Sequence, residues 1–339
     1  MNKNKFFITK NYKAQFTAAG KAKIDCERTL ERIGFKNIGL PRTTLPNSII
    51  GAILTFFSTI IGLIRLKRKS TICIQYPIKK YYNLIVKVAI IKECKVITVI
   101  HDLRSHRNKR LSTITEIKSF NRNHVIISHN EFMSKWLIEN KLKSKILNLN
   151  IFDYLSVNSD KAEKKLNKFE LVFAGALGIG KNGFIYDLDA IHPKNYAINL
   201  YGVGFDKNEL QKNSIINYKG FFRADEVVNE LQGSFGLVWD GQSIEECSGN
   251  FGEYLKINNP HKTSLYLRAG LPIIIWDKAA LAKFITDNKV GIAISSLKDL
   301  DKILKNIDRE QYQEMINNSK IISKKIGSGY YLESAIKQC

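Results

Sequence analysis

The sequence has few cysteines, and no two of them lie close together. The five are odd in number and scattered over 339 residues, at Cys26, Cys73, Cys94, Cys247 and Cys339. This spacing argues against a disulfide framework and against a zinc site, both of which need closely paired cysteines. No secretory signal pattern precedes the first apolar run at 6–8. We therefore expect a reduced protein in the cytoplasm.

Acidic residues are also scarce. The chain holds 53 Lys and Arg against 31 Asp and Glu, for a formal net charge of +22. Residues 1–150 carry 29 basic and 8 acidic residues, whereas residues 151–339 carry 24 and 23. A basic excess confined to one half is expected where that half faces a polyanion or an anionic membrane. No nucleic-acid module accompanies it, so we expect no nucleic acid partner. A basic surface without a specific partner is the remaining alternative.

The motifs of metal chemistry and nucleotide hydrolysis are missing. There is no H-E-x-x-H, no C-x-x-C and no acidic cluster, and Asp187-Leu188-Asp189 falls in a predicted helix. The run from Gly175 to Lys181 is not a P-loop, because Asn182 stands where the metal-binding hydroxyl belongs. The sequence therefore predicts no metal site and no hydrolysis of ATP or GTP.

Short apolar runs alternate with longer amphipathic ones through the whole chain, which is typical of βα units around parallel sheets. We expect an α/β protein with two domains, at residues 1–155 and 169–310, and a polar linker at 156–168. A C-terminal helical segment at 311–339 would be able to return to the first domain. The predicted strands are 6–9, 71–75, 96–101, 125–128, 146–149, 169–174, 198–201, 216–218, 235–239, 272–276 and 291–294.

One segment departs from this pattern. Residues 43–64 contain no charged residue, and the basic cluster 65–69 follows them. About 20 apolar residues can cross a bilayer, and basic residues after them mark the cytoplasmic side. We expect a helix at 45–66, and three alternatives remain for it. It could span the membrane, it could rest on the membrane interface or dock a subunit, or it could be an ordinary buried helix.

The second half contains the densest group of polar candidates. The strand at 235–239 leads to Asp240, and a polar loop that includes Glu253 follows. Asn259 is a favoured cap and Pro260 a favoured first residue of the next helix. The N–H groups at a helix start attract anions. The sequence therefore predicts a phosphate or pyrophosphate site at this helix start, which also carries His261, Lys262 and Ser264.

Three other strand ends carry residues suited to related chemistry. Gly175 opens a glycine-rich turn that ends at Lys181, where the backbone can approach a phosphate and the lysine can balance its charge. Tyr201 begins a second glycine turn, which either shapes the same cleft or is only a turn. In the first half, Asp102 follows the strand at 96–101. It is placed to remove a proton from an acceptor hydroxyl, or else to cap the next element.

Several motifs, in order along the chain, resemble one family. The match covers nearly the whole chain and is densest from Phe235 to Phe284. The chain resembles the bacterial β-1,6-galactofuranosyltransferases of O-antigen and capsule assembly. More distantly, it is similar to the glucosyltransferases that extend N-acetylglucosamine on streptococcal and lactobacillar adhesins. The motifs are VIHD at 99–102, ISHN at 127–130, IFDYL at 151–155, FAG at 173–175, YGVGF at 201–205 and the run from Gly236 to Leu267 that contains NNPHK.

The resemblance implies a GT-B fold, in which two Rossmann-like domains flank a cleft. It also implies metal-independent transfer from a nucleoside diphosphate sugar that the second domain holds. Lys262 lies in the matching NPHK motif and Lys181 near the matching glycine turn, so both are expected at the donor diphosphate. The family's nucleotide pocket runs along 220–223, which makes Phe222 a candidate stacking partner for uracil, with Arg223 beside it. Residues 175–180 depart from the Gly-Asn-Leu of close relatives.

The leading hypothesis is an inverting transferase that moves galactofuranose from UDP-galactofuranose to a hydroxyl of a polyprenyl-diphosphate-linked glycan. It would need no metal or other cofactor and would work at the inner face of the cell membrane. Asp102 is the expected general base, with Asp240 or Glu253 in reserve. A hexosyltransferase that uses another UDP-sugar is the alternative, and a non-catalytic sugar-nucleotide-binding subunit is a remote one. The sequence does not specify whether the protein forms a homo-oligomer.

Overall fold

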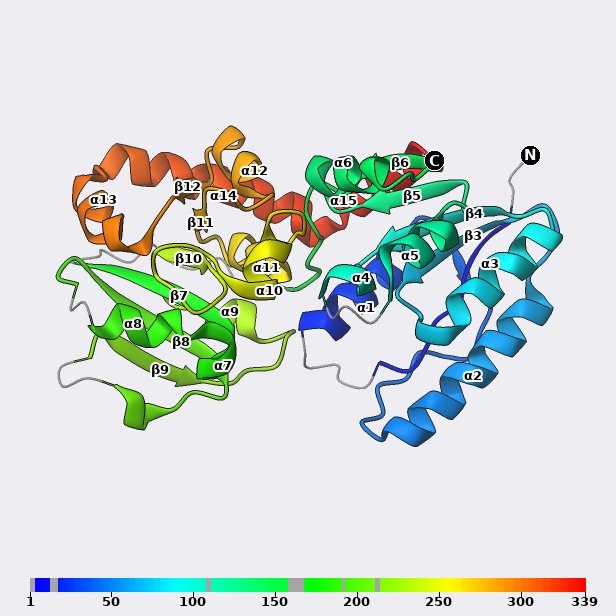
Figure 1. Ribbon diagram of the computed structural model, residues 1–339, viewed down its shortest axis with the longest axis horizontal. Coiled ribbons are helices and arrows are strands. Elements are labelled where there is room, and N and C mark those ends of the chain that lie inside the picture. The colour runs from blue at the N-terminus through cyan, green and yellow to red at the C-terminus, as the bar shows by residue number, and fades with distance from the viewer. Residues whose placement is uncertain (1–3, 13–17, 108–110, 158–167, 191–192, 211–213) are drawn as a thin grey trace. The chain divides into compact units, whose positions relative to one another are not determined.

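A computed structural model describes residues 4–12, 18–107, 111–157, 168–190, 193–210 and 214–339. The chain divides into two compact units, one formed by Met1–Asp153 with Gly329–Cys339 and the other by Tyr154–Ser328. Each unit contains a parallel sheet flanked by helices (Figure 1). The α/β class predicted from the alternating pattern is confirmed.

The sheet of the first unit has six parallel strands in the order β2-β1-β3-β4-β5-β6. Its central strands are buried along nearly their whole length, so they read as continuous apolar runs. The strand order reverses between β1 and β3. The strands are β1 (Lys5–Phe7), β2 (Lys36–Asn37), β3 (Thr71–Tyr76), β4 (Lys95–Ile100), β5 (Val125–Ser128) and β6 (Lys145–Asn148).

Polar caps set the start of several helices in this unit. Asn47 caps α2 and Asn130 caps α6 by accepting N–H groups of the first turn. The last helix, α15, is held by Asp153, which accepts the N–H groups of Tyr331 at 3.2 Å and Leu332 at 2.9 Å. The helices are α1 (Ala18–Arg32), α2 (Ser48–Arg65), η1 (Lys79–Tyr81), α3 (Tyr82–Ile91), α4 (Arg104–Arg107), α5 (Thr113–Phe120), α6 (Glu131–Glu139) and α15 (Tyr330–Lys337).

The sheet of the second unit also has six parallel strands, in the order β12-β11-β10-β7-β8-β9. The strands are β7 (Phe169–Ala176), β8 (Tyr196–Val203), β9 (Ile216–Gly220), β10 (Phe235–Val238), β11 (Ile273–Trp276) and β12 (Gly291–Ile294). The helices are α7 (Ile179–Asn182), α8 (Phe184–Ala190), η2 (Lys207–Glu209), α9 (Val227–Glu230), α10 (Gly249–Leu255), α11 (His261–Arg268), α12 (Ala282–Asp287), η3 (Leu297–Asp299), α13 (Leu300–Asn306) and α14 (Arg309–Ser328).

The unit boundaries differ from the suggested division. Along the chain, the first unit ends at Asp153 and the second begins at Tyr154. Most of the linker predicted at 156–168 lies outside the described residues. The segment 311–339 contains two helices, of which α14 belongs to the second unit and α15 to the first. Gly329 separates them with a left-handed φ of 72°, and a Cβ there would lie 2.5 Å from Thr29 Oγ1. Glycine therefore allows the chain to leave one unit and pack on the other.

Residues 45–66 do not form the ordinary buried helix that was one alternative. They form α2, and 28% of it is buried in the structure. Among the described residues it is the one helix long and apolar enough to cross a membrane. Its buried side consists of Gly51, Ser58, Thr59, Gly62 and Leu63, of which all but Leu63 are small.

Candidate functional site

The strand order of the second unit reverses between β7 and β10. The chain places β8 and β9 beyond β7, and β11 and β12 beyond β10. Loops that leave two such neighbouring strands diverge, and ligands of open α/β sheets bind at the carboxyl ends there. β7 extends through Gly175 to Ala176, so the glycine-rich turn begins two residues later than predicted, and β10 leads to Asp240. The sheet therefore brings two predicted site regions to one edge.

Lys262, at the start of α11, forms an ion pair at this edge. Its Nζ donates to Asp240 Oδ1 at 2.9 Å and to Trp239 O at 3.0 Å. The ammonium also lies 4.4 Å from the centroid of the Phe173 ring on β7. The exposed fractions of the lysine and aspartate side chains are 14% and 12%. Because both charges are partly desolvated, their fields act more strongly on a bound ligand than those of surface residues.

Tyr266 fixes α11 against the sheet. It follows Lys262 by four residues, so both side chains lie on the same face of the helix. Its hydroxyl accepts the Ala174 N–H of β7 at 2.7 Å. Gly236 on β10 leaves room for the ring, since a Cβ there would lie 2.2 Å from Tyr266 Cγ. This packing sets the position from which Lys262 reaches Asp240.

The start of α11 differs by one residue from the prediction. Pro260 is the cap and His261 the first helical residue, because Pro260 has an extended ψ of 127°. No side chain of the cap residue bonds the first turn. Asn259, the predicted cap, is buried beside it. The start of a helix and a lysine on its first turn are each features that attract anions.

His261 and Ser264 point to other parts of the unit than Lys262 does. The His261 ring stacks on Tyr154 at a centroid distance of 4.9 Å, and the Tyr154 hydroxyl donates to Ala224 O at 2.5 Å. His261 therefore connects α11 to the predicted nucleotide segment at 220–223. Ser264 is buried, and its hydroxyl has no hydrogen-bond partner in the described part of the chain.

The glycine-rich turn after β7 is joined to the loop after β10. Gln242 Nε2 donates to Ile179 O at 2.9 Å. Lys181, on α7, places its ammonium 4.9 Å from the Phe251 ring of α10. A Cβ on Gly202 would lie 1.8 Å from Gly175 O, so the ends of β7 and β8 meet backbone to backbone. The structure thus places Gly175 at the end of β7, Lys181 on α7, and Asp240 and Lys262 around the β7–β10 edge.

Tyr201 and Phe222 pack together, and Phe222 is the more accessible. The Tyr201 hydroxyl donates to Glu230 O at 3.3 Å and accepts the Gln232 N–H at 2.9 Å. Burial raises the pKa of Tyr201. Its ring centroid lies 6.1 Å from that of Phe222, which is half-buried, and Arg223 is exposed. Tyr201 therefore supports the segment at 220–223, and Phe222 offers the ring that a base could cover.

Glu253 faces away from this group. Its side chain is 64% exposed and pairs with Lys256 at 2.7 Å on the surface of α10. It is two residues from Phe251, which contacts Lys181, so the two side chains leave the helix about 200° apart. The structure gives Glu253 a surface ion pair.

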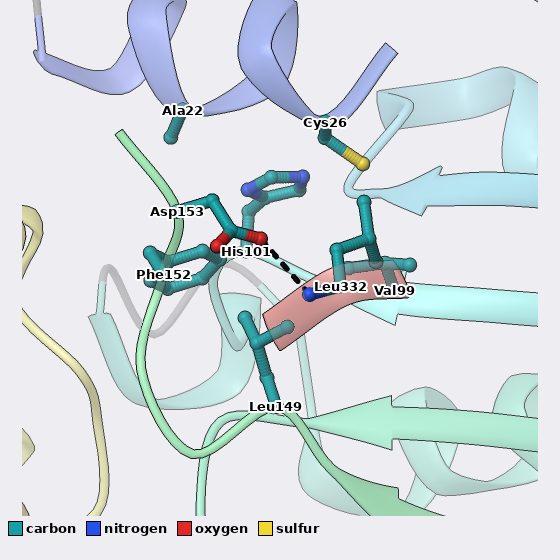
Figure 2. A pocket seen from close by; sticks show the side chains of 8 residues that line it. All are labelled: Ala22, Cys26, Val99, His101, Leu149, Phe152, Asp153 and Leu332. Carbon is teal, nitrogen blue, oxygen red and sulfur yellow. Dashed lines mark hydrogen bonds between the residues drawn. The ribbon is translucent and has the colours of Figure 1, made fainter. Parts of the chain in front are cut away.

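In the first unit, Asp102 follows β4 and is half-buried. At the start of the next helix, α4, the N–H groups of Arg104 and Ser105 donate to the buried carboxylate of Glu116. His101, just before Asp102, is buried and donates from Nε2 to Gln75 Oε1 at 2.7 Å. Figure 2 shows the small cavity that His101 shares with Ala22, Cys26, Val99, Leu149, Phe152, Asp153 and Leu332.

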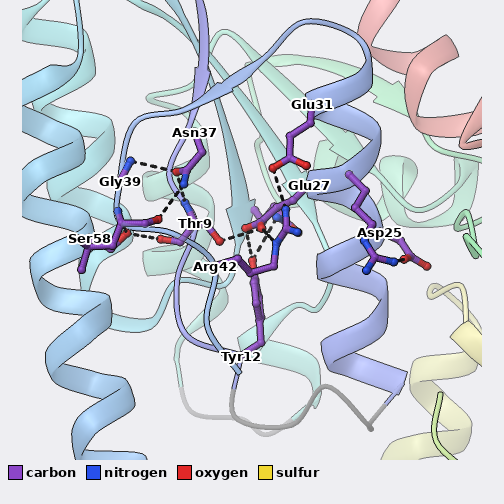
Figure 3. A network of polar contacts seen from close by, with 12 residues as sticks. Thr9, Tyr12, Asp25, Glu27, Glu31, Asn37, Gly39, Arg42 and Ser58 are labelled. Atoms are coloured by element: carbon purple, nitrogen blue, oxygen red, sulfur yellow. Dashed lines mark hydrogen bonds and ion pairs between the residues drawn. The ribbon is translucent and has the colours of Figure 1, made fainter. Parts of the chain in front are cut away.

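A buried polar network in the same unit was not predicted. Glu27 accepts hydrogen bonds from Thr9 Oγ1 at 2.8 Å, Tyr12 OH at 2.5 Å and Arg42 Nε at 2.5 Å (Figure 3). Gln75 Nε2 donates to the same Tyr12 hydroxyl at 3.5 Å. A continuous chain of hydrogen bonds therefore runs from Arg42 to His101, next to Asp102. No sequence signal marks it, because its members are far apart in the chain.

Two family models match nearly the whole chain. The model of the glucosyltransferase 3-like N-terminal domain matches residues 5–151, and that of the C-terminal domain matches residues 171–339. The chain belongs to the glucosyltransferase 3-like family. It is therefore a glycosyltransferase.

The relatives agree with the motifs. Beta-1,6-galactofuranosyltransferase WbbI of Escherichia coli (strain K12) is 34% identical over 309 residues, which cover 90% of this chain and 89% of WbbI. Glucosyltransferase 3 of Streptococcus gordonii is 30% identical over 122 residues, or 36% of each chain. The predicted resemblance to galactofuranosyltransferases, and to the adhesin glucosyltransferases at greater distance, is confirmed.

Solved structures show the same fold. The lipopolysaccharide outer core galactosyltransferase WaaB has a TM-score of 0.60 at 10% identity, over 99% of both chains. AviGT4, a glycosyltransferase involved in avilamycin A biosynthesis, has a TM-score of 0.58 at 9% identity, over 99% of this chain and 96% of that one. The predicted GT-B fold of this glycosyltransferase is confirmed.

The cysteine near the candidate site, Cys247, is buried. Burial raises the pKa of the Cys247 thiol, whose sulfur accepts the Asp240 N–H at 3.5 Å. In the part of the chain that the structure describes, no group of three His, Cys, Asp or Glu residues could hold a metal ion. The charged side chains at the β7–β10 edge are those of Lys181, Asp240 and Lys262.

Proposed function

We propose that this glycosyltransferase moves galactofuranose from UDP-galactofuranose to a sugar hydroxyl of a lipid-linked glycan. The observation that carries the proposal is the 34% identity to a β-1,6-galactofuranosyltransferase over 90% of the chain. Similarity that extends through both units favours a shared donor and a shared class of acceptor more than a match of one domain does. We place the reaction at the cytoplasmic face of the cell membrane.

The geometry of the second unit supports a donor site at the β7–β10 edge. Lys262 and the N–H groups at the start of α11 would bind the diphosphate, with Lys181 as a second cation. Phe222 would stack on the uracil ring and Arg223 would lie beside it. Two fixed ammonium groups balance the charge of the departing UDP, so the proposal requires no divalent metal.

The proposed transfer is a single displacement with inversion. The acceptor hydroxyl oxygen forms a bond to C1 of the sugar as the bond from C1 to the β-phosphate oxygen breaks. UDP leaves with the electron pair, and the hydroxyl proton goes to a carboxylate. We assign the proton to Asp102, which directly follows β4 and His101 and is half-buried.

Transfer assays with two donors test the proposal. Purified protein is incubated with UDP-galactofuranose or UDP-glucose, a panel of glycan acceptors and EDTA. We expect transfer from UDP-galactofuranose that EDTA does not reduce. Transfer from UDP-glucose alone would overturn the galactofuranose assignment, and complete loss in EDTA would overturn the metal-independent mechanism. NMR of the anomeric centre in the product tests inversion.

A transferase for another hexose is the second candidate. The family model is that of glucosyltransferase 3-like proteins, and a streptococcal glucosyltransferase 3 matches part of the chain at 30% identity. The same assay distinguishes this candidate. A non-catalytic nucleotide-binding subunit would bind UDP without any turnover, and Asp102→Asn would then change nothing, whereas we expect it to abolish transfer while UDP still binds.

A further inference from the structure

Helix α2 has an unusual distribution of side chains. Six of its large apolar side chains are at least 44% exposed. At about 100° per residue, they lie within an arc of roughly 120° around the helix axis. An ordinary surface helix turns such an arc toward the core. Here it faces outward, and its members are Ile49, Ile50, Ile53, Phe56, Phe57 and Ile64.

The opposite side of α2 holds the helix on the first unit. Ser58 Oγ donates to Thr9 O at 2.6 Å and accepts the Leu40 N–H at 3.1 Å, and Figure 3 shows Ser58 beside Thr9. Thr55 Oγ1 accepts the Asn11 N–H at 3.3 Å. These hydroxyls satisfy backbone groups that would otherwise be buried without partners.

Glycines bring this side of α2 close to the side chains of Ile8 and Asn11. A Cβ on Gly51 would lie 2.3 Å from Asn11 Nδ2, and one on Gly62 would lie 2.7 Å from Ile8 Cδ1. Rotating the helix to bury its apolar arc would break these contacts and place isoleucine and phenylalanine where only glycine and serine fit. The outward apolar arc is therefore a consequence of how the helix is anchored.

The surroundings of the arc are strongly basic. Residues 48–95 contain one acidic residue, Glu93. Arg65 and Lys67 at the end of α2 are exposed, and Arg68 pairs with Glu93. The neighbouring α3 contacts α2, exposes Leu84 and Ile91, and carries Lys92, whose Nζ donates to Leu63 O at 2.7 Å. The basic residues of this segment are Arg65, Lys67, Arg68, Lys69, Lys79, Lys80, Lys87, Lys92 and Lys95.

We propose that the outward arc of α2 binds the interface of an anionic lipid bilayer, with the helix lying in the plane of the surface. The apolar arc would enter the boundary between head groups and acyl chains, and the exposed Arg65 and Lys67 would contact anionic head groups. Charge complementarity selects this occupant, because a second copy of the chain would bring a like-charged segment against the arc. A spanning orientation would require the hydrogen bonds of Ser58 and Thr55 to break.

Vesicle flotation with the full chain tests this surface independently of the donor. The vesicles are phosphatidylcholine alone or phosphatidylcholine with phosphatidylglycerol at about two to one. We expect flotation with the anionic vesicles, less binding at high salt, and release by alkaline carbonate. A variant with Ile53→Ser, Phe57→Ser and Ile64→Ser should float at least about tenfold less.

Matched controls carry the same chemical change elsewhere on the first unit. Ile114→Ser with Ile138→Ser alters side chains that are 69% and 58% exposed on α5 and α6, and should float like the wild type. Arg65→Gln with Lys67→Gln should reduce binding to anionic vesicles, whereas Lys135→Gln with Lys143→Gln should reduce it less. Circular dichroism checks that each variant is folded.

Four results would overturn the proposal. They are absence of flotation, equal loss in the control variants, retention after carbonate, and a lipid-free dimer that the triple variant converts to a monomer in light scattering. Retention after carbonate would identify a spanning helix. A dimer disrupted by the triple variant would show that a second copy covers α2.

Discussion

Lys262 is held in a defined position by protein oxygens. Asp240 and Trp239 accept two of the three N–H donors of its ammonium group. The Phe173 ring covers a further side of the ammonium. Little of the side-chain entropy of this lysine remains to be lost if an anion binds, so the position of its ammonium group is preorganised.

Replacing Lys262 with methionine should weaken the binding and the turnover of the donor. Methionine keeps most of the apolar stem but removes the charge, so we expect Lys262→Met to lower kcat/KM for UDP-galactofuranose by roughly 100-fold. Calorimetry should show weaker binding of UDP. Lys278→Met is the matched control, because Lys278 is 61% exposed and its pair with Glu246 is 3.8 Å long. Equal effects of the two substitutions would contradict the assigned role.

Glu27 is the centre of the buried network in the first unit. Its side chain is fully buried, and three donors satisfy it. Burial raises its pKa, and the adjacent Arg42 guanidinium opposes that shift. A buried carboxylate of this kind is costly to disturb, because Arg42 would lose its buried partner and keep only the exposed Glu31.

Substitution of Glu27 should therefore destabilise the first unit. We expect Glu27→Gln to lower the free energy of unfolding by about 3 kcal/mol in urea titrations. Glu31 is a natural control, since it pairs with the same Arg42 at 3.0 Å but is 47% exposed. Glu31→Gln should cost less than about 1 kcal/mol. Similar losses for both would show that burial does not determine the strength of these pairs.

At the scale of elements, Asp153 joins the end of the first unit's main segment to α15. It is 7% exposed and accepts two N–H groups from the first turn of the helix. Burial raises its pKa to about 7, although those two hydrogen bonds oppose the shift. The carboxyl group is thus protonated in the folded state over a pH range in which it is ionised in the unfolded chain.

This pKa makes stability depend on pH with a definite sign. A raised folded-state pKa gives a contribution that is complete below about pH 4 and is lost as pH rises through about 7. Between pH 5 and pH 8, we expect the wild type to lose roughly 2–3 kcal/mol relative to Asp153→Asn, measured by urea unfolding at both values. Asp287→Asn, at a site 57% exposed, should show a constant difference. A constant difference for Asp153→Asn would refute the burial argument.

The positions of helices and strands were predicted better than the side of each element that is buried. Every predicted strand from 6–9 to 291–294 is found, and the central ones are the clearest, because parallel strands buried on both faces leave continuous apolar runs. The two-residue β2 was missed, since Lys36 and Asn37 carry no apolar pattern. The direction that α2 faces could not be predicted from its composition, because the residues at 8–11 that it packs on are far away in sequence.

At the scale of the whole molecule, the chain end completes the first unit. Residues 329–339 belong to that unit although they follow the second. Tyr331, Leu332, Ala335 and Ile336 are buried there, and Lys95 Nζ donates to Cys339 O at 2.8 Å. Stability of the first unit therefore depends on residues 329–339, which follow the whole of the second unit in the chain.

Removing this helix should affect the first unit selectively. For a chain that ends at Ser328, we expect calorimetry to show that the first unit unfolds at a lower temperature than in the full protein. Limited proteolysis should cut first at residues before 153 and leave the second unit intact. A chain that ends at Lys337 keeps α15 and should unfold nearly like the full protein. Equal sensitivity of both units in the shorter chain would contradict this account.

The sequence by itself determined the alternation of strands and helices, the glycine turns, the NPHK helix start and the charge asymmetry. These are local patterns, and each reflects the backbone or solvent preference of neighbouring residues. Only the tertiary structure decided which of them meet. It joined Asp240 to Lys262 and turned Glu253 to the surface. It also linked Arg42 through Glu27 to His101, and left the apolar arc of α2 outside. Those outcomes depend on packing between segments distant in the chain, which no local pattern encodes.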